Sequence, residues 1–205
     1  LYYPAAINPS PIIVLMHWVH GGQLDWAAIA PWLQNRGMPV AHGLDAAGGD
    51  VAWWDPSWFP PIPEGKSYAV FMFNFRHCDA LNGCSRWDSR GWLLDAEAAV
   101  EAARHLPGVD PNRVVTVGAS IGADAAVDAC GEGCVAALSL SPGGYLGVNY
   151  ADAVRAVAEK GGLVQCIYNE RDRQTAGACT AYTGDGYTAS GFEGDAHGMT
   201  LIDPS

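Results

Sequence analysis

The segment from Arg113 to Ala129, RVVTVGASIGADAAVDA, constrains the fold more than any other part of the sequence. It begins with the β-branched run Val114 to Val117, which predicts a buried strand. A Gly-Ala-Ser-Ile-Gly turn follows, and the small residues after it recur at helical spacing. The segment therefore predicts a strand, a tight turn centred on Ser120 and a helix that packs closely on a sheet.

The turn matches the pattern G-x-S-x-G, in which a strained strand-to-helix turn exposes the serine hydroxyl. We therefore predict that Ser120 is a nucleophile. Gly118 and Gly122 carry no Cβ atom, so strand and helix can approach each other there. The backbone N–H of Ile121 lies at the predicted helix N-terminus, where it would stabilise an oxyanion. The alternative is a glycine-rich turn with a structural serine.

Apolar runs alternate with helical patterns along the 205 residues. We expect strands over 11–16, 67–75, 114–117, 135–140, 163–168 and 187–192, and helices over 25–37, 91–106 and 150–160. The alternation predicts one α/β domain over 1–205, with a doubly wound, mostly parallel sheet and helices on both faces. Tyr2 and Tyr3 are expected to pair with an edge of this sheet, and a ligand is expected at the carboxyl ends of its strands.

Residues 38–66 break this alternation and form an insertion rich in tryptophan and proline. Clustered tryptophans are costly to leave in water, so they must cover an apolar surface. Either they cap the edge of the sheet, or some of them line a substrate cleft. The candidate substrate-binding residues are Trp53, Trp54 and Trp58 of the insertion, together with Trp18, which follows the first long strand.

A serine nucleophile needs a base within hydrogen-bond reach and an acid that orients the base. His197 follows the last predicted strand in a glycine-flanked loop, and we predict that it is the base. Asp172 follows the strand over 163–168 and is the preferred acid, with Glu170 as the alternative. Asp195 is too close to His197 in the sequence to orient it easily.

The loop after the first long strand, His17-Trp18-Val19-His20-Gly21-Gly22, should supply a second oxyanion donor. We choose the backbone N–H of Val19, with Trp18 as the alternative. His17 is expected to brace the loop through a hydrogen bond. A metal site at His17 and His20 is disfavoured because a third ligand is not evident, and no cofactor is expected.

The six cysteines form couples that are close in sequence, which suggests disulfides and a secreted or periplasmic location. The couples are Cys78 with Cys84, Cys130 with Cys134, and Cys166 with Cys179. The chain begins at Leu1 without a visible signal peptide, so we expect that a secretory leader has been removed.

A net charge of −11 argues against nucleic acid and anionic membrane surfaces as partners. No segment is apolar for long enough to span a membrane.

With these residues in order, the chain resembles the α/β-hydrolase superfamily, most closely the small esterases and dienelactone-hydrolase-like proteins without a helical lid. The matching segments are HWVHGG, GASIG, NERD and DAHG. The resemblance implies Ser120 as nucleophile, His197 as base and Asp172 as acid, with Ile121 and the loop after His17 as oxyanion hole. Three departures are His17-Trp18 in place of the usual His-Gly, serine in place of the dienelactone enzymes' cysteine, and only eight residues after His197, too few for the usual closing helix.

The sequence thus predicts a serine carboxylester hydrolase for small-molecule or polymeric esters, including aromatic ones. The alternatives are a serine peptidase or thioesterase of the same fold, and a binding module without catalysis.

Overall fold

The aliphatic and β-branched runs of the sequence form the strands of a seven-stranded sheet in the computed structural model, which describes residues 1–37, 59–80 and 82–202. The order across the sheet is β1-β3-β2-β6-β7-β8-β9. These strands span Tyr2–Tyr3 (β1), Ala69–Met72 (β3), Ser10–Met16 (β2), Val109–Ala119 (β6), Cys134–Leu140 (β7), Leu163–Asn169 (β8) and Tyr187–Phe192 (β9).

All neighbouring strands of this sheet are parallel except β1, which runs antiparallel to β3 at one edge. The expected edge pairing of the two N-terminal tyrosines is confirmed, with Tyr2 opposite Phe71 and Tyr3 opposite Val70. The interior strand β2 is buried along its whole length, as expected for a strand covered on both faces. The predicted fold class is therefore confirmed.

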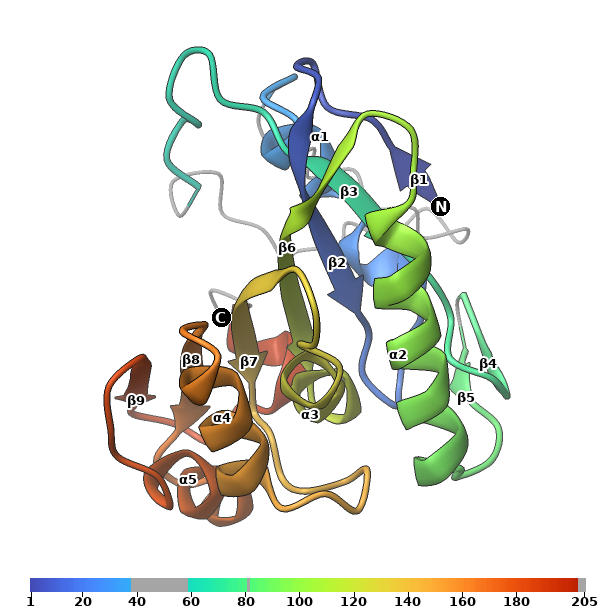
Figure 1. Cartoon of the computed structure of the whole chain (residues 1–205). Coiled ribbons are helices and arrows are strands. Elements are labelled where there is room, and N and C mark those ends of the chain that lie inside the picture. Colours follow the sequence, from blue (N-terminus) through green and yellow to red (C-terminus); the bar gives the residue numbers. More distant parts are fainter. Residues whose placement is uncertain (38–58, 81, 203–205) are drawn as a thin grey trace.

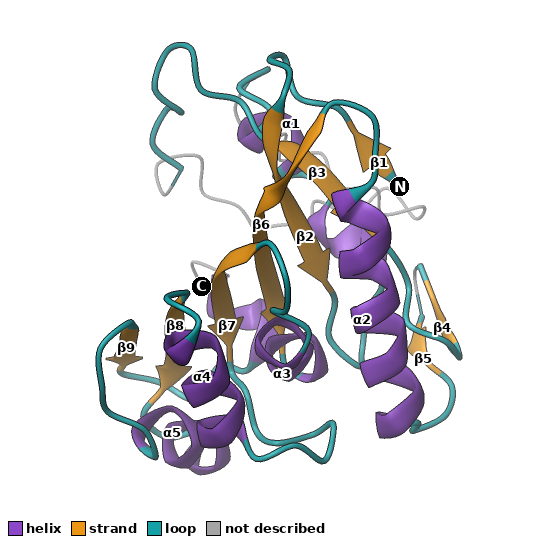
Figure 2. Ribbon diagram, in the orientation of Figure 1, coloured by secondary structure: helices purple, strands orange, loops and turns teal. Residues whose placement is uncertain are grey.

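Helices cover both faces of the sheet (Figures 1 and 2). One face carries α2, α3, α4 and α5, whose cores are the clusters around Trp92, Val127 and Val154. The other face carries α1 and two 3₁₀-helices, which pack with Trp26, Leu33 and Met199 against the opposite side of the strands. The helices span Ser89–Arg104 (α2), Ile121–Asp128 (α3), Tyr150–Glu159 (α4), Arg173–Thr180 (α5) and Ala30–Leu33 (α1), and the 3₁₀-helices span Gln23–Trp26 and Gly198–Ile202.

Two predicted elements differ from the structure, and one helix of the structure was not predicted. The expected helix over 25–37 is split into the 3₁₀-helix Gln23–Trp26 and the four-residue α1, because Pro31 cannot donate a backbone hydrogen bond within a longer helix. The expected strand over 67–75 is reduced to Ala69–Met72. Helix α5 was not predicted, since its sequence contains Gly177 and two threonines, which are weak helix formers.

Each of the three predicted cysteine couples is a disulfide: Cys78–Cys84, Cys130–Cys134 and Cys166–Cys179. The first joins two short strands, β4 (Cys78–Asp79) and β5 (Gly83–Cys84), in what we call the disulfide hairpin. In the described part of the chain no helix is long and apolar enough to cross a membrane.

The insertion over 38–66 lies largely outside the described residues, including Trp53, Trp54 and Trp58. Their predicted role at the substrate and the single-domain boundary 1–205 therefore stay predictions.

Two glycines allow β6, α3 and β2 to approach one another closely. A Cβ atom on Gly118 would overlap the carbonyl oxygen of Gly122, and one on Gly122 would lie 2.6 Å from the carbonyl oxygen of His17. The obstructing atoms belong to the backbone and cannot move aside as a flexible side chain would. The two glycines of the G-x-S-x-G pattern are thus required by packing at this point of the fold.

We expect Gly118→Ala to lower the free energy of unfolding by about 1–3 kcal/mol, because the added methyl group overpacks the contact between β6 and α3. The matched control is Gly177→Ala in α5, where an added Cβ meets nothing within 4 Å. The control should be neutral or stabilising by about 0.5–1 kcal/mol, because alanine favours a helix. Urea unfolding measures both, and equal stability of the two variants would contradict this packing account.

Candidate active site

Ser120 occupies the turn between β6 and α3, and its backbone has φ 55° and ψ −115°. A positive φ is strained for a residue with a side chain, so the surrounding structure must hold it in place. The N–H of Ser120 donates to the carbonyl oxygen of Leu140 at the end of β7, at 2.8 Å. The adjacent strand therefore fixes the turn, and the serine lies at the carboxyl edge of the sheet.

His197 lies in the loop between β9 and the 3₁₀-helix Gly198–Ile202, and backbone contacts hold this loop on both sides. The N–H of His197 donates to Oγ1 of Thr200 at 2.9 Å, and the N–H of Gly198 donates to Oγ of Ser141 at 3.0 Å. Nδ2 of Asn169, the last residue of β8, donates to the carbonyl oxygen of Ala196 at 3.1 Å. The imidazole is therefore anchored through the ends of β7 and β8.

Asp172 is the N-cap residue of α5, in the short turn after β8, and its carboxylate faces the imidazole of His197. Oδ2 of Asp172 lies 2.6 Å from Nδ1 of His197, and Nε2 of His197 lies 2.9 Å from Oγ of Ser120. The three residues predicted as a triad are thus hydrogen-bonded in series. The alternative acids, Glu170 and Asp195, have exposed side chains.

His17 is fully buried between the end of β2 and the segment after β3. Its Nδ1 lies 2.7 Å from the carbonyl oxygen of Trp18, and its Nε2 accepts from the backbone N–H of Phe75 at 3.1 Å. Because a carbonyl oxygen only accepts, Nδ1 carries the hydrogen and the ring is neutral. Burial lowers the pKa of His17 to about 4. The expected bracing role is confirmed, and both ring nitrogens are occupied.

The loop after His17 lies beside the nucleophile. The close approach of Gly122 to the carbonyl of His17 places the start of this loop against the first turn of α3. A Cβ on Gly198 would lie 3.0 Å from the indole of Trp18 and 3.4 Å from Cβ of Ser120, so Trp18 and Ser120 flank the same glycine. Trp18, a predicted substrate-binding residue, is therefore next to the serine.

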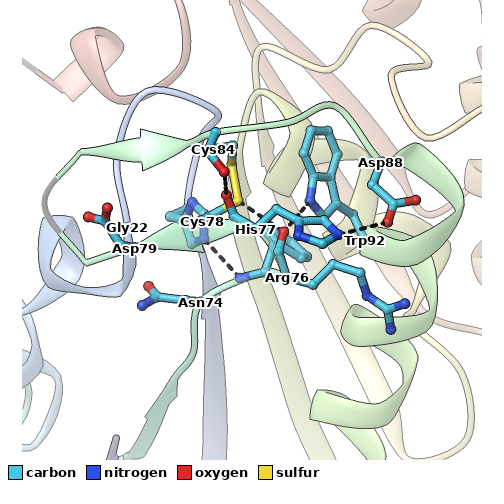
Figure 3. Close-up of a disulfide and its surroundings, with 12 residues drawn as sticks. Gly22, Asn74, Arg76, His77, Cys78, Asp79, Cys84, Asp88 and Trp92 are labelled. Carbon is cyan, nitrogen blue, oxygen red and sulfur yellow. Dashed lines mark hydrogen bonds and ion pairs between the residues drawn. A yellow bond between two sulfur atoms is a disulfide. The ribbon is translucent and has the colours of Figure 1, made fainter.

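The disulfide hairpin packs on this loop (Figure 3). The N–H of Cys84 donates to the carbonyl oxygen of Val19 at 2.9 Å. A Cβ on Gly83 would lie 2.6 Å from the same oxygen, and one on Gly22 would overlap the carbonyl oxygen of Asp79. The hairpin thus holds the carbonyl group of Val19, the residue whose N–H is one of the two predicted oxyanion donors. The other, Ile121, is the first residue of α3, where backbone N–H groups have no partner within the helix.

Comparisons with known proteins support the fold. No family model matches the sequence. A carboxylesterase from Bacillus cereus superposes with a TM-score of 0.57 at 12% identity, over 99% of this chain and 89% of that chain. A dienelactone hydrolase-like promiscuous phosphotriesterase from metagenomic libraries superposes with a TM-score of 0.54 at 14% identity, over 93% and 72%. This chain has the α/β-hydrolase fold.

Two curated relatives of this α/β-hydrolase chain carry the same name, uncharacterized protein YfhR. The protein from Escherichia coli K12 is 33% identical over 100 residues, which are 48% of this chain and 33% of the relative. The protein from Salmonella typhi is 30% identical over 142 residues, which are 68% of this chain and 43% of the relative. The matches therefore span less than half the length of these relatives.

Asp124 and Tyr145 support the site, although the sequence analysis did not single them out. Asp124 is buried in α3, and its carboxylate accepts from the N–H of Gly143, at 3.1 Å, and from that of Tyr145. Burial raises the pKa of Asp124 to about 6, although these hydrogen bonds lower it. The ring of Tyr145 meets that of His197 edge to face, with centroids 6.1 Å apart.

One sequence signal pointed to Asp124: it is the only charged residue among the small and apolar residues 118–127. In the described part of the chain, no cluster of three or more metal-ligating side chains could hold a metal ion.

The buried neutral ring of His17 predicts a pH dependence of stability. Its pKa is about 4 in the folded protein and 6.5 when unperturbed, so the unfolded chain binds more protons between these values. The stability that the protein has because the His17 ring is neutral is fully present above about pH 6.5 and is lost as the pH falls towards 4. It is on the order of 2–3 kcal/mol.

We therefore expect His17→Gln to be less stable than the native protein at pH 7 but to lose less stability between pH 7 and 4.5. The matched control is Val154→Ala on α4, which removes buried apolar contacts but no titratable group, so it should lower stability and keep the native slope. Denaturant unfolding at several pH values measures the slopes. Parallel curves for the native protein and His17→Gln would contradict the neutral buried state.

Proposed function

We propose that this protein is a serine carboxylester hydrolase that uses Ser120, His197 and Asp172. The observation that carries the proposal is the hydrogen-bond series from Asp172 through His197 to Ser120, at 2.6 and 2.9 Å. It joins side chains that are 25 and 77 residues apart in the sequence and lie on a positive-φ turn, a loop and a helix start. A structural serine needs none of these features. The esterases among its structural relatives agree with the proposal.

In this proposal Oγ of Ser120 attacks the carbonyl carbon of the ester while Nε2 of His197 takes its proton. Asp172 keeps Nδ1 protonated and stabilises the imidazolium that forms. The developing oxyanion is stabilised by backbone N–H groups, for which Ile121 and Val19 are the candidates. His197 then gives its proton to the leaving alcohol, and a water molecule activated by His197 releases the acid from the acyl-enzyme.

The same residues would serve a serine peptidase or a thioesterase, which differ in the leaving group. A binding module without turnover is the third possibility. A panel of ester, amide and thioester substrates separates the first two. A fluorophosphonate probe that fails to label Ser120 in the folded protein would favour the binding module.

The disulfides support a secreted or periplasmic location, because such bonds persist in oxidising compartments. We infer small-molecule or polymeric esters as substrates, and no nucleic-acid partner, given the net charge of −11.

Ser120→Ala should lower kcat on p-nitrophenyl acetate by at least about 10³-fold, because the nucleophile is lost. Asp172→Asn should lower kcat by roughly 10²–10⁴-fold, because the imidazole loses the partner that fixes its tautomer. The control is Ser190→Ala on β9, which should keep full activity. Activity retained by a folded Ser120→Ala variant would remove the assignment.

The contact between Cys84 and Val19 predicts that the disulfide hairpin supports turnover rather than stability alone. The variant Cys78→Ser/Cys84→Ser should lower kcat roughly tenfold with little change in KM, because a misplaced oxyanion donor stabilises the transition state less. The matched control is Cys130→Ser/Cys134→Ser, which removes a disulfide at the start of β7, the end of this strand away from Ser120.

Each double variant should cost about 2 kcal/mol of stability in the chain-entropy model, so the assay is run well below both melting temperatures. Equal kcat values for the two double variants would show that the hairpin has no specific effect on the donor.

A further inference from the structure

Trp87 has an exposed indole ring that also contacts a buried neighbour. It follows the disulfide hairpin and precedes Asp88, whose carboxylate accepts from the N–H of Gly91 and so caps α2. Its ring packs edge to face on the buried Trp92, with centroids 5.0 Å apart. Despite this contact 55% of Trp87 remains exposed, which is costly for so large an apolar side chain. Packing against α2 thus accounts for less than half of its surface.

The ring of Trp87 is one member of an aromatic series that leads to the proposed catalytic base. Tyr145 meets Trp87 edge to face at 6.4 Å between centroids, and it meets His197 in the same way at 6.1 Å. Tyr145 is half-buried, and the carboxylate of Asp124 holds its backbone N–H. The series therefore runs from the imidazole, through a fixed phenol, to an exposed indole.

Two independent parts of the fold bring these rings together. Tyr145 comes from the loop after β7, which α3 anchors through Asp124. Trp87 comes from the segment between the disulfide hairpin and α2, where Ser85 also hydrogen-bonds to the carbonyl oxygen of His77 at 2.8 Å. Both backbones are fixed, so the exposed indole face requires little ordering when a ligand covers it. A preorganised apolar surface of this kind binds rigid ligands well.

We propose that Trp87 and Tyr145 bind an aromatic ring of the ester substrate. The proposal rests on the proposed esterase function, and it places the scissile carbonyl at Ser120 with the ring a few bonds away, against Tyr145 and Trp87. Aromatic rings prefer edge-to-face or offset contacts with such side chains, which favours a planar ring over a saturated ring of similar size. The ring can be carried by the acyl part or by the alcohol part, and the two are separated by experiment.

The test uses two pairs of esters that differ only in the ring. Methyl 3-phenylpropanoate and methyl 3-cyclohexylpropanoate carry it on the acid, and 2-phenylethyl acetate and 2-cyclohexylethyl acetate carry it on the alcohol. Trp87→Ala should lower kcat/KM about tenfold for the phenyl ester of at least one pair, and less for its cyclohexyl partner. Hydrolysis of methyl acetate should be unchanged, and Trp87→Phe should restore most of the phenyl preference.

The matched control is Leu163→Ala, because Leu163 is 61% exposed and lies at the start of β8, at the opposite end of the strand from Asp172. It should leave all five esters unaffected. An equal loss on methyl acetate in Trp87→Ala, or an equal loss on phenyl and cyclohexyl esters, would overturn the ring-binding role. The pair that responds identifies the part of the substrate that carries the ring.

A binding measurement keeps this proposal separate from the proposed reaction. Calorimetry compares 3-phenylpropanoate and 2-phenylethanol binding to Ser120→Ala and to Ser120→Ala/Trp87→Ala. Roughly tenfold weaker binding of one of them to the double variant supports the subsite even if no ester is hydrolysed. Unchanged binding of both overturns it even if the native protein is an active esterase.

Discussion

The close backbone contact between β6, α3 and β2 is the constraint on which the rest of the structure depends. With glycine at 118 and 122, carbonyl groups of α3, of the end of β2 and of His17 lie where side chains would otherwise stand. The chain must therefore turn sharply at Ser120, in a conformation that only the surrounding contacts make tolerable. The strained turn at Ser120 places its hydroxyl at the carboxyl edge of the sheet, where the other parallel strands also end.

The loops at this edge are tied to one another mainly through backbone groups. His17 links β2 to the segment after β3, Ser141 links β7 to the His197 loop, and the N–H of Arg171 donates to the carbonyl oxygen of Gly194. Each contact uses at least one backbone group, but those of His17 and Ser141 also require these particular side chains. A site of this kind is preorganised, which is what electrostatic stabilisation of a transition state requires.

Local patterns in the sequence predicted the sheet, the serine turn and the cysteine couples, because each depends on residues close together in the chain. They also predicted the hydrogen-bonded residues His197 and Asp172, since carboxyl ends of parallel strands meet at one edge. They did not predict α5, whose composition disfavours a helix and which is stabilised by packing against β8. Nor did they predict Asp124, Tyr145 or Trp87, whose roles depend on which loops become neighbours. The tryptophans predicted to bind substrate were those of the insertion and Trp18, and Trp87 was not among them.

The position of His197 after an edge strand has a consequence for how the protein matures. Ser120 and its strained turn are complete once β6, α3, β2 and β7 have assembled, but the imidazole belongs to a segment that the ribosome adds 77 residues later. It reaches the serine only after β9 has docked in register on β8. If the proposed triad is correct, a partly folded chain with an intact turn would carry an ordinary serine hydroxyl. Its activation would then require the segment after β9 to be in place.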